Sequence, residues 1–277
     1  MPIMVFTVVL SAALLHATWN AIVKSAGDKF LTTIMVTAAA AGIAAAFLPF
    51  LTVPARASWP YIAVSVLFQI TYFLLVARTY QVADMSQTYP LMRGTAPLLV
   101  ALVTVFQAGD SLSFIAWIGV VGICVGIFSM TLDIKLHDRK GIYLALLNAF
   151  VIAGYTLIDG FGVRRSGAPA AYTLWIFLLT GLPLTIWAVV GRRVTFVPYV
   201  ARHWRIGIVG GIGTTASYGL ALWAMTIAPI AVVAALRETS ILFGTLIAGL
   251  VLKEHIGVRR IIAACIIASS AAVLRLA

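Results

Sequence analysis

Apolar segments about 20 residues long follow one another along almost the whole chain, separated by short polar stretches. A bilayer core roughly 30 Å thick is spanned by about 20 mostly apolar residues in a helix. Of the 277 residues, 62% are apolar and 10% are charged. Ordinary soluble domains are about half apolar and about a quarter charged. A water-soluble fold could not bury that much apolar surface, so the sequence predicts an integral membrane protein.

The apolar runs do not alternate with polar residues, as the stretch 261–273 illustrates. Strands of membrane β-barrels do alternate in this way, so the spanning segments are expected to be helices. We predict an all-α integral membrane protein with ten transmembrane helices. Their predicted ranges are 3–24, 31–51, 59–81, 87–107, 113–132, 141–159, 170–190, 205–226, 231–252 and 258–275.

A polar stretch near the middle, residues 133–140, divides the chain into halves 1–132 and 141–277 and is interpreted as a linker. A shift of 144 positions (237 − 93) lays Arg93 on Arg237 and also Thr95 on Thr239, so an intramembrane arginine recurs. Five helices per half is an odd number, so two halves of the same fold must lie upside down relative to each other. The sequence therefore predicts a 5+5 inverted repeat, which is the architecture of many secondary transporters.

Basic residues dominate the ionisable side chains and give a net charge of +11. They lie between apolar segments rather than in one exposed basic stripe, so we predict no nucleic-acid partner. Twelve Lys and Arg residues fall on the side of the membrane that holds residues 133–140, and four fall on the other side. The positive-inside rule makes the first side cytoplasmic and places both termini outside.

Motifs for catalysis or nucleotide binding are absent from the sequence. It contains no GxxxxGK[ST], HExxH or GxSxG pattern, and its four histidines are scattered. Cys124 and Cys265 lie in apolar runs without metal-ligand spacing. We predict no catalytic site, no metal and no cofactor, and we expect a gradient to drive transport.

Two arginines, Arg93 and Arg237, lie about two turns inside their predicted helices at equivalent positions of the two halves. A charge at a helix centre costs at least about 2.5 to 3.5 kcal/mol on insertion scales, so each needs a partner or an aqueous cavity. A guanidinium offers a planar fork of donors that suits carboxylate or phosphate oxygens. We predict that both contact substrate. The alternative is that Glu238 neutralises Arg237 and that Arg93 snorkels or bonds backbone carbonyls.

Polar and aromatic side chains on other helices extend this candidate site. His16 and Asn20 share one face of the first helix, with Trp19 beside it. Tyrosines at helical spacing could line a wet pocket, although packing or interface roles are commoner for them. The predicted substrate-binding residues are Arg93, Arg237, Glu238, His16, Trp19, Asn20, Tyr72, Tyr80, Tyr155 and Tyr218. The predicted proton-coupling residues are Asp159 and Glu238, with a solvated helix cap as the alternative for Asp159.

Three runs resemble the EamA-type halves of the drug/metabolite transporter superfamily: HATWNAIVK (16–24), YPLMRGTAPLLVALV (89–103) and VAALRETSILFGTLIAGLVLKE (233–254). The resemblance covers nearly the whole chain. It implies ten helices in a 5+5 inverted repeat, a central cavity lined by helices one, three, four, six, eight and nine, alternating access, and transport of small metabolites, often as export. Members with anionic substrates, such as plastid phosphate translocators, are similar in using basic residues that map onto Arg93 and Arg237. The resemblance also implies cytoplasmic termini, opposite to the charge count.

These observations together predict a secondary transporter, with export as the expected direction, for a small anionic or zwitterionic metabolite such as an amino acid. We expect it in the cell (inner) membrane, as a monomer or homodimer. One alternative is an exporter of lipophilic or cationic drugs, for which Glu238 and the aromatic residues would matter most. The other is a membrane-embedded enzyme or lipid-linked flippase, which would require clustered catalytic groups or wide lateral openings.

Overall fold

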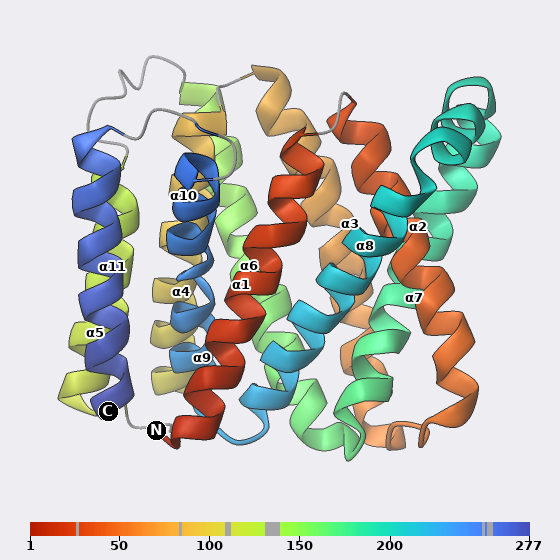
Figure 1. The fold of residues 1–277 in the computed structure, drawn as a ribbon. Helices are drawn as coiled ribbons and strands as arrows, with labels where there is room; N and C mark the ends of the chain where they lie inside the picture. Colours follow the sequence, from red (N-terminus) through yellow and green to blue (C-terminus); the bar gives the residue numbers. More distant parts are fainter. Residues whose placement is uncertain (26–27, 83–84, 109–111, 131–138, 251–252, 254–256) are drawn as a thin grey trace.

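The computed structural model describes residues 1–25, 28–82, 85–108, 112–130, 139–250, 253 and 257–277. Throughout these residues the regular structure is helical, with no strand (Figure 1). The α-helices are α1 (Ile3–Ser25), α2 (Lys29–Phe47), α3 (Trp59–Val82), α4 (Met85–Ala108), α5 (Phe114–Ser129), α6 (Arg139–Ser166), α7 (Pro169–Gly191), α8 (Arg193–Met225), α9 (Ile230–Arg237), α10 (Ser240–Leu250) and α11 (Val258–Leu276). Two short 3₁₀ turns, η1 (Leu48–Phe50) and η2 (Arg56–Ser58), lie between α2 and α3.

The prediction of an all-α membrane protein is confirmed. Within the described residues, eight segments are long and apolar enough to cross a bilayer, and α9 and α10 together form one of them, Ile230–Leu250. The apolar helix α5 is shorter, and α11 packs antiparallel beside it (Figure 1). Each of the ten predicted segments therefore corresponds to a helix or to a helix pair. The inverted relation between the halves stays a prediction, and most of the predicted linker, 133–138, lies outside the described residues.

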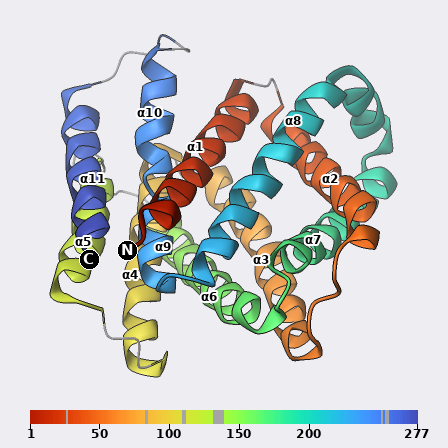
Figure 2. The ribbon, with the colours of Figure 1, turned by 60° about the horizontal axis from the view of Figure 1, so that its bottom comes forward.

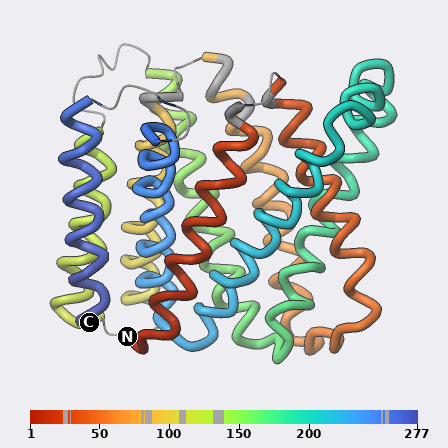
Figure 3. The backbone as a smooth tube through the Cα atoms, viewed as in Figure 1, coloured from red at the N-terminus to blue at the C-terminus, as the bar shows by residue number. Residues whose placement is uncertain are grey.

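The helices run up and down between two ends of the bundle, and both chain termini lie at the same end (Figure 1). Seen obliquely from that end, α5 and α11 lie on one flank and α2 and α7 on the other (Figure 2). The short helix α9 lies between these flanks, where it contacts α1, α4, α5, α6 and α8. The backbone trace shows how α8 crosses the bundle obliquely from the outer flank to the centre (Figure 3).

Two helix ends differ from the sequence prediction by the widest margin. The predicted sixth helix stops at residue 159, but α6 continues for seven more residues to Ser166. Gly160 and Gly162 permit close packing in this added part of α6: a Cβ on Gly160 would lie 2.6 Å from Ile230 Cδ1. Small residues serve this purpose widely in membrane helices. Similarly, α8 begins at Arg193 rather than near residue 205.

Candidate functional site

The ninth predicted segment is interrupted in the middle of the protein. α9 ends at Arg237 and α10 begins at Ser240. At the break, the Glu238 and Thr239 N–H groups donate to carbonyls three residues earlier, each at 3.0 Å, instead of four residues earlier. Every residue of α9 before Arg237 is buried. The break therefore places two charged side chains, Arg237 and Glu238, in the protein interior.

The corresponding helix, α4, is continuous from Met85 to Ala108, but prolines interrupt its ladder of backbone hydrogen bonds. It contains two prolines, Pro90 and Pro97, on either side of Arg93. Proline has no N–H, so the Arg93 carbonyl loses the helical donor that residue 97 would otherwise supply. Under the 144-residue shift, the break at residues 238–239 corresponds to residues 94–95, between these prolines. Interrupted helices at corresponding positions of two halves indicate a binding site in secondary transporters.

An ion pair joins α4 to the break between α9 and α10. Arg93 Nε donates to Glu238 Oε2 at 2.8 Å, and both side chains are buried, with exposed fractions of 9% and 6%. Glu238 therefore pairs with Arg93 and not with its neighbour Arg237. The second guanidinium nitrogen Nη2 of Arg93 is buried and has no hydrogen-bond partner among the described residues. A hydrogen-bond donor of a charged group is thus available at the centre of the bundle.

Arg237 forms no ion pair within the described structure, although Glu238 lies within electrostatic range of it. Its guanidinium carbon lies 5.0 Å from the ring centroid of Tyr218, a cation–π geometry. Among the described residues it forms no hydrogen bond or ion pair. Arg237, Arg93 and Glu238 all line one small cavity, together with Tyr155. Part of the positive charge at this cavity is therefore uncompensated.

The cavity is too small for a metabolite in this conformation. Its volume is about 10 Å³, room for about one water molecule. The other lining residues come from α4, α6 and α9 and are mostly apolar: Ala96, Pro97, Val100, Ile152, Thr156 and Ala234. The structure is thus closed around the charged groups.

Asp159 is a second buried carboxylate. It is fully buried and accepts hydrogen bonds from the Tyr218 hydroxyl and, at 3.2 Å, from the Tyr172 hydroxyl. No lysine or arginine among the described residues forms an ion pair with it. The alternative of a solvated helix cap is wrong, because α6 continues two turns beyond it. The described part of the chain contains three carboxylate side chains. Two of them, Asp159 and Glu238, are buried in the interior of the helix bundle.

A series of tyrosine rings connects the predicted aromatic residues. The ring centroids of Tyr72 and Tyr155 are 6.0 Å apart, and those of Tyr155 and Tyr218 are 6.5 Å apart. Tyr218 thus contacts Arg237 through its ring and Asp159 through its hydroxyl. Three of the four predicted tyrosines therefore lie together beside the charged groups. The side chain of the fourth, Tyr80, lies outside the described residues.

The three predicted residues of α1 differ in how close they lie to the arginines. His16 is partly buried, lies within electrostatic range of Arg93 and Arg237, and packs edge-on against the ring of Trp19 at 5.5 Å. The Asn20 amide donates to the His16 carbonyl at 2.7 Å, which is a bond within α1. The indole N–H of Trp19 is buried without a partner among the described residues. Only His16 is brought near the arginines; neither Trp19 nor Asn20 lines the cavity.

Two polar residues near the site were missed by sequence reasoning. Tyr172 is 13 residues beyond Asp159, and no spacing rule relates side chains across the turn between α6 and α7. Asn148 is fully buried on α6, where its amide donates to Met92 Sδ at 2.8 Å and its carbonyl oxygen has no partner within the described structure. A lone asparagine in an apolar helix is a recognisable signal of an interior position.

The fold and this site define a class: a multi-pass membrane protein whose helices enclose a charged core between the proline-containing helix α4 and the break from α9 to α10. Residues 139–276 match the EamA-like transporter family. The chain belongs to this family, so it is a transporter of the drug/metabolite type, as the resemblance predicted.

Similarity to solved structures extends over the whole chain. One crystal structure matches 100% of this chain and 98% of its own chain, with a TM-score of 0.76 and 18% sequence identity. Similarity at this identity supports the common fold alone. No curated protein sequence matches the chain.

Proposed function

We propose that this protein is a secondary transporter that exports a small anionic or zwitterionic metabolite, such as an amino acid, by alternating access through the charged core. The observation that carries the proposal is the uncompensated guanidinium of Arg237 at the cavity, beside a free donor of Arg93. A substrate carboxylate between these groups would accept hydrogen bonds from both. Hydrogen bonds to charged groups contribute about 1.5 to 3 kcal/mol each. The two arginines are therefore sufficient to select an anionic group.

The closed cavity is consistent with an occluded state of the transport cycle. Substrate could enter only after the helices around the cavity separate. Helix α4 and the α9–α10 pair are suited to such a movement, because fewer backbone hydrogen bonds resist bending at Pro97 and at the 238–239 break. Bending at these two points would open the cavity first to one side of the membrane and then to the other, while the binding site stays near the middle of the bilayer.

Export of cationic or lipophilic drugs is less well supported. A cation would need a free carboxylate or a free aromatic face. Glu238 is already paired with Arg93, and the Tyr218 ring already carries Arg237. The remaining acid, Asp159, is enclosed by tyrosine hydroxyls. The charge available to a ligand at this cavity is positive.

A thermal-stability screen of the purified protein tests the substrate class. A ligand that binds only the folded state raises the unfolding temperature with its concentration. We expect amino acids, other carboxylates or phosphorylated compounds to stabilise the protein, and organic cations to have no effect. Stabilisation by cations alone would support the drug-export alternative.

We propose that Asp159 carries the coupling proton, since no lysine or arginine among the described residues forms an ion pair with it, whereas Glu238 is held by Arg93. Asp159→Asn keeps the shape of the side chain and removes its exchangeable charge. In proteoliposomes containing a pH-sensitive dye, this variant is expected to lose proton movement driven by substrate. Asp28→Asn, which alters only the cap of α2, is the control. Proton movement that persists in Asp159→Asn would exclude this role.

The proposed location is the cell (inner) membrane, with the basic end of the bundle in the cytoplasm. Described basic residues such as Arg139, Arg192 and Arg260 lie at the end opposite the termini. The positive-inside rule then places the C-terminus outside the cytoplasm. Alkaline phosphatase fused after residue 277 is expected to be active, since it folds only outside the cytoplasm. An inactive phosphatase fusion, together with fluorescence from a green fluorescent protein fusion at the same position, would show that the C-terminus is cytoplasmic.

A further inference from the structure

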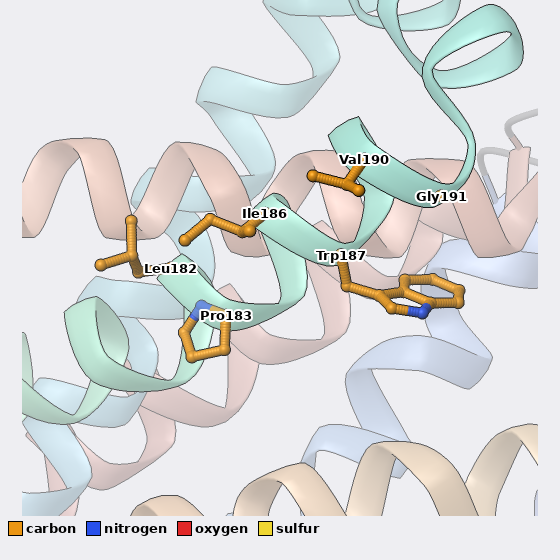
Figure 4. Close-up of a pocket in the computed structure, with 6 residues that line it drawn as sticks. All are labelled: Leu182, Pro183, Ile186, Trp187, Val190 and Gly191. Atoms are coloured by element: carbon orange, nitrogen blue, oxygen red, sulfur yellow. The ribbon is translucent and has the colours of Figure 1, made fainter.

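A hollow of about 510 Å³ lies along α7, and it shares no lining residue with the cavity of the charged core. Figure 4 shows the side chains that line this hollow. One stripe of the helix lines it: Leu182, Pro183, Ile186, Trp187, Val190 and Gly191. The stripe is about 15 Å long at the usual helical rise. None of these six residues is ionisable, so the hollow does not suit a charged metabolite. Its shape and chemistry fit a hydrocarbon chain that runs along the helix.

A cationic side chain lies at one end of this stripe. The guanidinium carbon of Arg192 is 5.9 Å from the ring centroid of Trp187 and 5.2 Å from that of Phe30. The two rings contact each other edge-on at 6.0 Å, so α2 and α7 together support the guanidinium. Arg192 and the next residue, Arg193, are both exposed. Among the described residues, Arg192 forms no ion pair with a carboxylate.

The position of this arginine matches a membrane–water boundary. α7 is one of the segments able to span a bilayer, and Arg192 directly follows its last residue, Gly191. Tryptophan and arginine are typical of that boundary, where the ring lies at the level of the lipid headgroups. A ligand that satisfies both parts must have an apolar chain and a negative group at its end.

We propose that this face of the protein binds an anionic phospholipid, with an acyl chain along the α7 stripe and the phosphate at Arg192 and Arg193. A zwitterionic lipid could fill the hollow but would bring no net negative charge to the two arginines. The site therefore discriminates between lipids by headgroup charge. This proposal is independent of the substrate site.

Native mass spectrometry of the detergent-purified full chain tests the proposal with equimolar phosphatidylglycerol and phosphatidylcholine. We expect the wild-type protein to retain phosphatidylglycerol in preference to phosphatidylcholine. A basic residue near a lipid surface strengthens anionic lipid binding by about fivefold. Arg192→Gln is expected to weaken phosphatidylglycerol binding by about that factor and to leave phosphatidylcholine binding unchanged.

Two further variants make the test specific. Arg259→Gln removes the same charge at the start of α11, on the same end of the bundle, and should preserve the preference. Ile186→Trp fills the hollow and should weaken retention of both lipids. Equal retention of the two lipids by the wild-type protein would overturn the proposal. An equal loss of phosphatidylglycerol binding in Arg192→Gln and Arg259→Gln would also overturn the proposal, because the lipid preference would then reflect the overall charge.

Discussion

Arg237→Ala is expected to lose at least about 100-fold in affinity for an anionic or zwitterionic substrate while the protein remains folded. Removing one partner of a buried, hydrogen-bonded charge pair in a complex costs about 2 to 5 kcal/mol, and 1.4 kcal/mol is a factor of ten. In the closed structure the Arg237 guanidinium lies over the face of the Tyr218 ring and forms no ion pair among the described residues. Loss of the Arg237 side chain should therefore lower the free energy of unfolding only slightly and weaken substrate binding strongly. Titration of ligand against the unfolding temperature measures both quantities.

Two matched variants separate the charge from its geometry. Arg237→Lys keeps a positive charge but lacks the planar fork, so an intermediate affinity is expected. Arg165→Ala removes an exposed arginine at the end of α6, which packs on Tyr61, and should bind substrate normally. Wild-type affinity in Arg237→Ala would mean that this arginine does not contact substrate.

Arg93→Ala is expected to destabilise the protein by about 3 to 5 kcal/mol, in contrast to Arg237→Ala. The substitution leaves the Glu238 carboxylate buried without its cation, and an uncompensated buried charge has a cost of this size. Glu238→Ala should destabilise the protein for the reciprocal reason. Equilibrium unfolding of the purified protein in a mixed detergent titration measures the change.

The double variant Arg93→Met/Glu238→Leu provides the control for the ion pair. Replacing both members of a buried pair by apolar residues of similar volume is often neutral for stability. The double variant should therefore be more stable than either single variant, and the cycle should give a coupling free energy above about 1 kcal/mol. Additive losses would show that the two side chains do not interact in the folded protein.

The fold was predictable because membrane insertion imposes a simple pattern. Apolar runs, delimited by charges, turns and polar clusters, located all ten segments, since backbone polar groups in lipid must be satisfied within each helix. Helix ends were less predictable. The predicted sixth helix stops at residue 159, but Gly160 and Gly162 continue α6, where they pack closely against Ile230 and Tyr172. The true interruption, at residues 238–239, contains neither glycine nor proline and gave no local signal.

The buried charged residues of the core were predictable from the sequence, but their pairing was not. The cost of burying a charge is enough to single out Arg93, Arg237 and Glu238 in the sequence. Sequence neighbours suggested that Glu238 would neutralise Arg237, yet the helix break directs Glu238 toward Arg93 on α4. Likewise, the tyrosine hydroxyls around Asp159 come from α7 and α8, whose packing against α6 is a property of the whole bundle.

Counterflow in proteoliposomes tests the central claim most directly, because exchange of a labelled ligand requires a complete transport cycle. Vesicles loaded with the compound that best stabilises the protein would be diluted into its labelled form. We predict uptake of label well above protein-free vesicles for the wild-type protein and for Arg165→Ala, and uptake at the protein-free level for Arg237→Ala. The contradictory result is exchange of organic cations by the wild-type protein with no exchange of any anionic or zwitterionic compound.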